Sequence, residues 1–190
     1  MRLILLKLLT RFGRVWVRGR GVGLGSGGWI HGLPELRLAK GSVVEIGNNV
    51  TLSSMPRFNP LAPGRRLSIV TTTSHARIVI KDGAGISNSL LSCSQSITIG
   101  ANTLIGAECL VVDSDFHGYP LDENKPAKSA PVDIGDHVFI GARTIILKGV
   151  KIGNRSVIGA GSVVTTDIPE NCLAAGNPAR VIRLFPTASA

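Results

Sequence analysis

The residues best suited to chemistry form a short polar cluster, Asp113, Asp115 and His117, in a polar, proline-containing stretch. A histidine titrates near neutral pH and can take a proton from a weak nucleophile such as a hydroxyl. A neighbouring carboxylate can orient the ring, and the spacing does not choose between the two aspartates. The other interpretation is a surface-loop histidine beside aspartates that cap a turn.

The elements that must position this cluster follow a repeat of six residues. A repeat of six matches neither the 3.6-residue period of a helix nor the alternation of a strand. It fits short strands and tight turns, three per coil, stacked as a parallel β-helix. The leading aliphatic positions are Ile134, Ile140, Ile146, Ile152, Ile158 and Val164, with Cys93, Ile99, Ile105 and Val111 in an earlier block.

The repeat is interrupted just where the polar cluster stands. Val111 and Ile134 are 23 residues apart, whereas one coil of three repeats needs about 18 residues. Residues 114–131 are therefore predicted to leave the β-helix as a projecting loop. Such loops carry function more often than the scaffold does.

The motifs IGAGSVV and GNPARVIR, within the stretch Ile134–Arg183, make the pattern specific. Over about residues 36–183 the chain resembles the hexapeptide-repeat acyltransferases of the sugar O-acetyltransferase type. The resemblance implies an all-β fold, a left-handed parallel β-helix with a protruding loop. It also implies a homotrimer with active sites between subunits, acetyl-CoA as the donor and no required metal.

The resemblance also implies roles for individual residues. It makes His117 the base that activates a hydroxyl of a sugar or glycan, with Asp113 or Asp115 as the orienting acid. It also suggests Asn88 at the acceptor, although a corner asparagine is the other interpretation. Apart from the resemblance, His75 is expected to line the acceptor site from the irregular stretch 56–77. An oxyanion needs a hydrogen-bond donor, which a backbone N–H near Gly141–Ala142 or the Asn88 amide could supply. The residues expected to bind CoA are Gly141, Ala142, Gly159, Ala160, Thr165, Thr166, Arg180 and Arg183. Thr166 stands where many relatives have a lysine or arginine, which puts one phosphate contact in doubt.

The first twenty residues hold most of the net charge. They contain six basic residues and no acidic one, in a 190-residue chain whose net charge is +9. On a helix, Lys7, Arg11, Arg14 and Arg18 fall on one narrow face beside a wide apolar remainder, as in interfacial helices on anionic lipid. A helix packed on its own domain or on a neighbouring subunit fits equally well. A targeting signal fits less well, because Lys7 interrupts the apolar run.

These patterns predict four segments and a location. The segments are a basic amphipathic helix at 1–20, a glycine-rich linker or irregular first coil at 21–35, the β-helix at 36–168 and a C-terminal extension at 169–190. Three cysteines without a CxxC pair favour a reducing compartment. A cytoplasmic protein is expected, peripheral on the inner face of the membrane if the helix binds lipid, in which case the acceptor could be lipid-linked. A nucleic-acid partner is not expected, because residues 21–190 carry only +3.

Several other functions compete with O-acetyl transfer. The runner-up is an N-acetyltransferase for an amino sugar nucleotide, and a non-catalytic trimeric scaffold is the second alternative. A zinc enzyme of the γ-carbonic anhydrase type is disfavoured, because no two of the four histidines have a ligand spacing. A covalent acyl-cysteine is disfavoured because Cys93 and Cys109 occupy inward positions of the repeat; Cys172 is also expected to pack.

Overall fold

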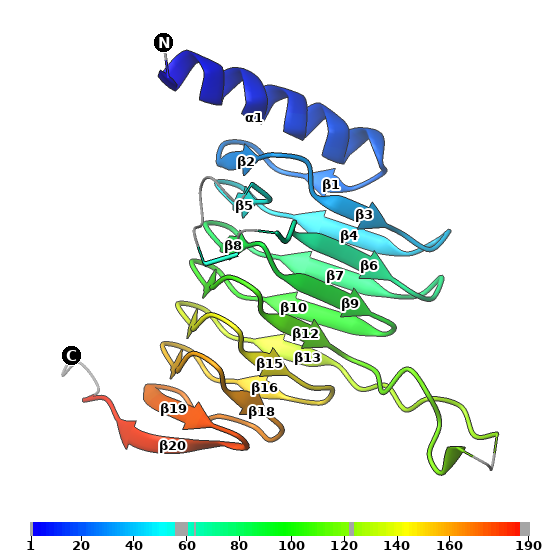
Figure 1. Cartoon of the computed structure of the whole chain (residues 1–190), viewed down its shortest axis with the longest axis vertical. Helices are drawn as coiled ribbons and strands as arrows, with labels where there is room; N and C mark the ends of the chain where they lie inside the picture. The colour runs from blue at the N-terminus through cyan, green and yellow to red at the C-terminus, as the bar shows by residue number, and fades with distance from the viewer. Residues whose placement is uncertain (1, 56–60, 63, 122–123, 187–190) are drawn as a thin grey trace.

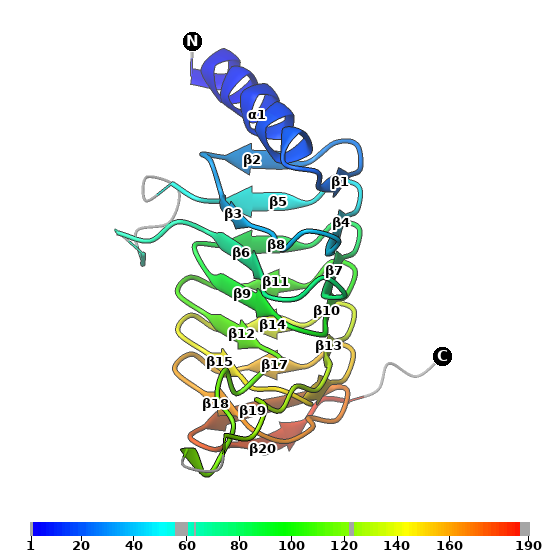
Figure 2. The ribbon, with the colours of Figure 1, turned by 90° about the vertical axis from the view of Figure 1, so that its right-hand side faces the viewer.

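The computed structural model describes residues 2–55, 61–62, 64–121 and 124–186, with only the backbone for residues 2–6. One helix, α1 (Arg2–Gly19), is followed by short strands that form the three faces of a prism (Figures 1 and 2). The first sheet contains β1 (Gly23–Leu24), β4 (Val43–Ile46), β7 (Arg77–Ile80), β10 (Ser96–Ile99), β13 (Val132–Ile134) and β16 (Lys151–Ile152). The second contains β2 (Trp29–His31), β5 (Thr51–Ser53), β8 (Gly85–Ser87), β11 (Leu104–Ile105), β14 (Phe139–Ile140), β17 (Val157–Ile158), β19 (Cys172–Gly176) and β20 (Ala179–Leu184). The third contains β3 (Glu35–Arg37), β6 (Ser68–Thr71), β9 (Leu90–Cys93), β12 (Leu110–Val112), β15 (Ile145–Ile146) and β18 (Val163–Val164).

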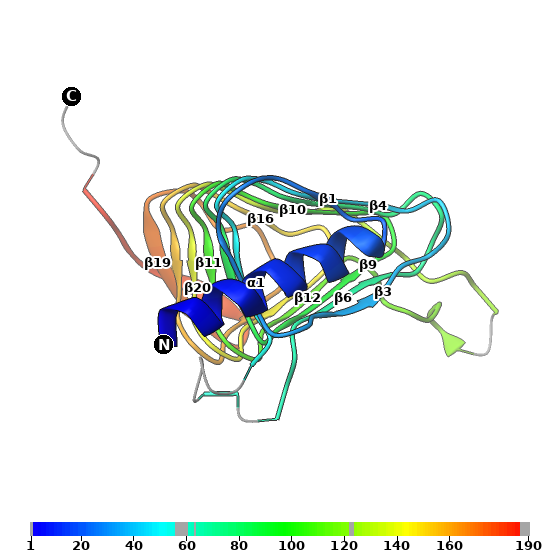
Figure 3. The same cartoon turned by 90° about the horizontal axis from the view of Figure 1, so that it is seen from above.

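The coils wind in the predicted direction. Seen from the N-terminal end, the chain turns counter-clockwise from the first sheet to the second and third as it moves away from the viewer (Figure 3). The left-handed parallel β-helix is therefore confirmed. This hand is the exception among parallel crossovers, which are right-handed in most folds.

The six-residue repeat sets the register between coils. In the first sheet Ile46 pairs with Ile80, Ile80 with Ile99, and the same column continues through Ile134 to Ile152. All five side chains are buried in the core. The core is thus a narrow stack of aliphatic residues, which accounts for an aromatic content of only 4 %.

The β-helix begins earlier than the predicted residue 36. The stretch expected to be a linker or an irregular first coil forms a first coil, because β1, β2 and β3 pair with β4, β5 and β6. Leu24, Ile30 and Leu36 are six apart and supply its inward residues. Glycine is needed at position 28, where φ is +68° and an added Cβ would collide with the Val50 carbonyl. At the other end, β19 continues the second sheet past residue 168, and β20 returns antiparallel to it.

The predicted loop leaves the prism between β12 and β13, at the corner where the third sheet passes to the first (Figure 1). Its base closes as a short antiparallel ladder. The Ala130 N–H donates to the Asp113 carbonyl at 2.9 Å, and the Asp115 N–H donates to the Lys128 carbonyl at 3.0 Å. We call the turns between the third and first sheets, residues 72–76, 94–95, 113–121, 124–131 and 147–150, the loop corner.

Candidate active site

Asp113 is fully buried at the base of the loop and closes the turn of the preceding coil. Its carboxylate accepts hydrogen bonds from the backbone N–H groups of Ser94 and Gln95, both at 2.7 Å, and of Ser96 at 2.8 Å. The Cys93 thiol donates to the same carboxylate at 3.3 Å. These donors occupy both oxygens, so in a single chain Asp113 does not orient His117.

His117 lies farther along the loop, exposed to solvent. It faces a hollow of about 520 Å³ lined by Asp115, His117, Gly118, Tyr119, Leu121, Lys128 and Lys148. Lys148 forms an ion pair with Asp115, at 2.7 Å between Nζ and Oδ1. Within the described residues, His117 has no hydrogen bond or ion pair. The loop therefore presents a free imidazole beside a carboxylate that is already paired.

The remaining histidines stand apart from this hollow. His75 lies exposed in the turn between β6 and β7, two coils nearer the N-terminus on the loop corner. His137 is exposed, as predicted, with φ of +57° at the turn between the first and second sheets. His31 is half-buried in β2, where its ring stacks on Trp29 at 6.0 Å and burial lowers its pKa.

A second set of predicted residues gathers at the turns between the second and third sheets. Asn88, Glu108, Arg143 and Gly161 all have positive φ and occupy equivalent turns in successive coils. Gly141–Ala142 and Gly159–Ala160 lie in the same turns. We call residues 88, 106–108, 141–143 and 159–161 the small-residue corner.

Close stacking explains the small residues. A Cβ added to Gly106 would lie 2.7 Å from the Ala142 nitrogen, and one added to Gly141 would collide with Ala160. The Gly141 N–H is used by the fold, because it donates to the Ile158 carbonyl at 2.8 Å. The following N–H, that of Ala142, has no hydrogen-bond partner within the described part of the chain, and neither has that of Ala160. The corner therefore presents free backbone donors beside small side chains.

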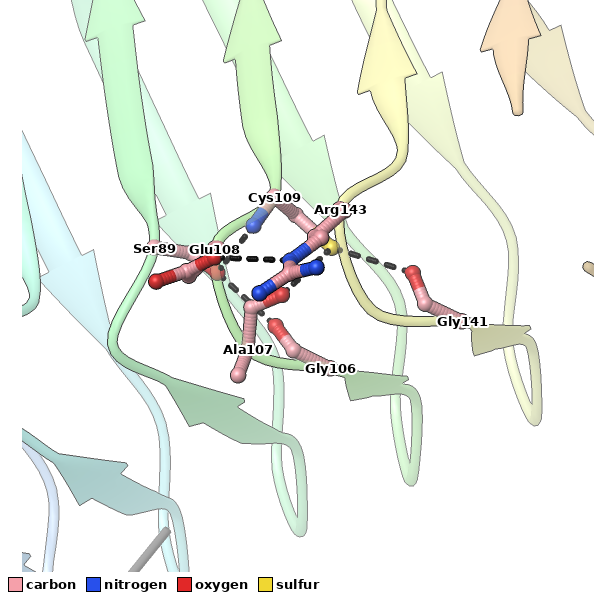
Figure 4. Close-up of polar contacts among 7 residues, drawn as sticks. All are labelled: Ser89, Gly106, Ala107, Glu108, Cys109, Gly141 and Arg143. Atoms are coloured by element: carbon pink, nitrogen blue, oxygen red, sulfur yellow. Dashed lines mark hydrogen bonds and ion pairs between the residues drawn. The ribbon is translucent and has the colours of Figure 1, made fainter. Parts of the chain in front are cut away.

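Side chains beneath and outside this corner hold it in shape (Figure 4). Ser89 Oγ donates to the Gly106 carbonyl at 2.8 Å and accepts from the Cys109 N–H at 3.0 Å. The Cys109 thiol contacts the Gly141 carbonyl at 3.2 Å. Outside, Arg143 Nε pairs with Glu108 at 2.9 Å.

The cysteines pack in the core, as predicted: Cys93, Cys109 and Cys172 are all buried and free. Burial, and then the adjacent Asp113 carboxylate, raise the pKa of the Cys93 thiol to about 12. Burial also raises the pKa of Cys109. Thiols held protonated in this way are poor nucleophiles.

Asn88 is a corner asparagine and is also fully buried, with φ of +40°. Its Nδ2 donates to the Arg65 carbonyl, and its Oδ1 has no partner among the described residues. Thr165 and Thr166 are exposed after β18, on the loop-corner side. Arg180 and Arg183 are exposed on β20, where Arg183 stacks over Phe185 at 5.5 Å.

One chain does not bring all these residues together. His117 projects from the loop corner, whereas Asn88 and Gly141–Ala142 lie at the small-residue corner across the third sheet. The third sheet, with β3, β6 and β12, separates the two corners (Figure 3). A site that uses both corners needs two copies of the chain. Within the described residues, no group of three His, Cys, Asp or Glu side chains could hold a metal ion.

The residues that match a known family lie in the six-residue repeat. The family described as "Hexapeptide repeat of succinyl-transferase" matches residues 96–114 and 131–166. Galactoside O-acetyltransferase of Escherichia coli is 48 % identical over 92 residues, which is 46 % of this chain and 44 % of that protein. A putative acetyltransferase of Bacillus subtilis is 37 % identical over 117 residues, 62 % of this chain and 60 % of that one. The chain thus spans about half the length of these curated relatives.

A solved structure extends the likeness to nearly the whole chain. An N-acyltransferase from Bacillus cereus, bound to a dTDP-amino sugar and coenzyme A, superposes with a TM-score of 0.70 at 21 % identity. The superposition covers 90 % of this chain and 88 % of that one, and it shows the shared fold. The chain has the repeat and the fold of the hexapeptide-repeat acyltransferases.

Lys148 is the functional candidate of this hexapeptide-repeat protein that sequence reasoning missed. The alignment of neighbouring coils could have identified this lysine. Val111 pairs with Ile146, so Asp113 and Lys148, each two residues later, occupy equivalent places in successive coils. A lysine there lies directly below the loop base and reaches Asp115.

Proposed function

We propose that the protein is an acetyl-CoA-dependent O-acetyltransferase that acts on a hydroxyl group of a sugar or surface glycan. The observation that carries the proposal is the free imidazole of His117 in the polar hollow of the loop. The likeness to a galactoside O-acetyltransferase supports a sugar acceptor. The free N–H groups of the small-residue corner support binding of an amide-rich donor such as CoA.

In the proposed reaction, His117 takes the proton of the acceptor hydroxyl as the oxygen attacks the thioester carbon. The carbonyl oxygen becomes an oxyanion, and the Ala142 N–H is the donor suited to receive it, since the Gly141 N–H is already bonded. The tetrahedral intermediate collapses, the C–S bond breaks, and CoA leaves as its thiol with the proton returned by His117. To accept a hydrogen bond from His117, Asp115 would have to weaken its ion pair with Lys148.

The proposed assembly is a homotrimer, in which the two corners of one chain would face different neighbours. The loop of one subunit would meet the small-residue corner of the next, bringing His117 to Asn88 and Ala142. The CoA arm would lie along Gly141–Ala142 and Gly159–Ala160, with Thr165 and Thr166 approaching it from the loop-corner side of the neighbouring subunit. Arg180 and Arg183 would bind its phosphates, because a guanidinium matches phosphate through two donors.

Titration calorimetry with CoA tests the donor site without knowledge of the acceptor. Saturable binding near one site per chain is expected, weakened in Arg180→Ala, with Arg20→Ala as a control arginine at the far end. No binding at millimolar CoA would overturn the proposal in favour of the scaffold. Sedimentation equilibrium tests the trimer in the same sample.

The acceptor is tested separately with matched pairs of sugars that differ only by a hydroxyl or an amino group at one carbon. Preference for the hydroxyl member supports O-acetylation. Preference for an amino sugar nucleotide would replace it with N-acetylation, and the Bacillus cereus structure is that of an N-acyltransferase.

A further inference from the structure

Helix α1 lies across the N-terminal end of the β-helix and covers the first coil (Figures 1 and 3). The side that faces the coil is made of Thr10, Gly13 and Val17, which are buried. Gly13 permits this approach, because a Cβ there would lie 2.8 Å from Ile30 Cγ2. The helix is therefore a cap that needs few apolar residues for its own packing.

Two of the four arginines in the helix belong to this cap. Arg14 donates to the backbone carbonyls of Gly25 and Gly27, and Arg18 donates to that of Leu24 at 3.0 Å. Burial, and then the neighbouring Arg18, lower the pKa of Arg14. These contacts satisfy carbonyls of the first coil, which has no preceding coil to pair with. The predicted basic face thus contains two arginines that hold the first coil, Arg14 and Arg18, and two exposed cations, Lys7 and Arg11.

The side of the helix that faces away from the β-helix is apolar. Leu8, Phe12 and Val15 are 56 %, 61 % and 70 % exposed. They are spaced i, i+4 and i+7, so they form one stripe. Lys7 and Arg11 are exposed beside it, and neither takes part in the cap contacts. An apolar stripe of this kind facing water is typical of an interaction surface.

The positive charge of residues 1–20 favours an anionic partner over a second copy of the chain. Residues 1–20 contain six basic residues and no acidic one. A second copy packed head to head would bring two such surfaces together and meet like-charge repulsion. An anionic bilayer instead offers phosphates to Lys7 and Arg11 and a boundary of acyl chains to the stripe. Within the described residues no helix is long and apolar enough to cross a membrane.

We propose that α1 docks this protein on anionic membranes, lying flat with Leu8, Phe12 and Val15 inserted and Lys7 and Arg11 at the lipid phosphates. The β-helix then stands on the membrane with its N-terminal end down. The surface is complete in one chain and does not rest on the proposed acetyl transfer. In a parallel trimer, three such helices would lie at one end and bind with avidity.

Flotation of the full chain with vesicles tests the proposal in the absence of CoA and acceptor. The chain is expected to float with vesicles that contain phosphatidylglycerol and to stay behind with phosphatidylcholine alone. Leu8→Ser combined with Phe12→Ser should abolish flotation and leave the melting temperature unchanged, since neither side chain packs on the coil. Ile182→Ser, at the opposite end and 62 % exposed, is the matched apolar control and should float normally.

The basic residues supply a second contrast. Lys7→Gln and Arg11→Gln should each weaken binding to the anionic vesicles by about fivefold without a change in melting temperature. Arg14→Gln should instead lower the melting temperature, because it releases two carbonyls of the first coil. Absence of flotation by the wild-type chain would overturn the proposal. So would an oligomer larger than a trimer that Leu8→Ser with Phe12→Ser disperses, because a second copy would then be the occupant.

Discussion

The loop corner and the small-residue corner are built from the same repeat but expose different groups to solvent. At the small-residue corner the three coils from β11 to β18 keep the six-residue register, and Gly141 and Ala142 expose the backbone itself. At the loop corner the register breaks after Val111, and the inserted residues expose side chains such as His117. A repeat can thus provide a smooth donor surface where it is kept and chemistry where it is broken. The proposed site combines both only between subunits.

The largest expected effect of a side chain at the loop corner is on catalysis. His117→Asn should lower kcat by about 10²–10⁴-fold, the usual contribution of a general base, while CoA affinity stays unchanged. His137→Asn is the matched control, because asparagine also tolerates the positive φ of that exposed turn. Initial rates with acetyl-CoA and the best acceptor provide the measurement. Equal rates in the two variants would show that the loop histidine is not the base.

A second contrast separates the two aspartates of the loop. Asp113→Asn should lower the free energy of unfolding by about 2–3 kcal/mol, because an amide group would face the backbone donors of the Ser94 turn. Asp115→Asn breaks a half-exposed ion pair with Lys148 and should cost no more than about 1 kcal/mol. Chemical denaturation of both variants tests this ranking. The reverse ranking would mean that the buried carboxylate does not hold the loop base.

The sequence predicted the scaffold well, because spacing alone determines which residues stack. Six-residue steps predicted the inward-facing residues from Ile134 to Ile158, one on each face of the prism in turn, and located the loop from the break in the repeat. Leu24, Ile30 and Leu36 follow the same six-residue spacing. The many glycines around them nevertheless favoured the prediction of a linker or an irregular coil. Helical periodicity separated basic from apolar residues in α1, yet it could not show that Arg14 meets carbonyls of residues 25 and 27.

The site was less predictable than the scaffold, because its contacts join different coils. The identity of His117 as the candidate base came from the family resemblance. The turn-closing role of Asp113 depends on N–H groups of the preceding coil, and the partner of Asp115 comes from the following one. These contacts depend on which residues of neighbouring coils lie side by side. The six-residue repeat fixes that alignment only when the residues of the inserted loop are left out of the count.

The small-residue corner is tested by filling it. Gly141→Ala should cost about 1–3 kcal/mol by overpacking against Ala160 and should weaken CoA binding. Gly21→Asn, in the turn after α1 and away from the small-residue corner, is the matched control, because its added Cβ meets nothing within 4 Å and asparagine accepts the positive φ. Thermal melting and CoA titration of both variants provide the measurement. A tolerated alanine at 141 would mean that neighbouring coils can separate there.

The smallest effects are expected from the cysteines that lie behind each corner. Cys93 sits against Asp113 and Cys109 beneath Gly141, and both are packed rather than reactive. The native protein at pH 8 should leave all three thiols unlabelled by a thiol reagent, whereas the unfolded chain should label three. Because the pKa of Cys93 in the folded chain is raised from 9.0 to about 12, its contribution to stability is complete below pH 9 and is lost as the pH rises toward 12. Cys93→Ala should flatten that part of the pH profile at a cost of about 1 kcal/mol and should leave kcat unchanged. A large loss of kcat without loss of stability would instead point to an acyl-cysteine, and the proton transfer assigned to His117 would have to be reassigned.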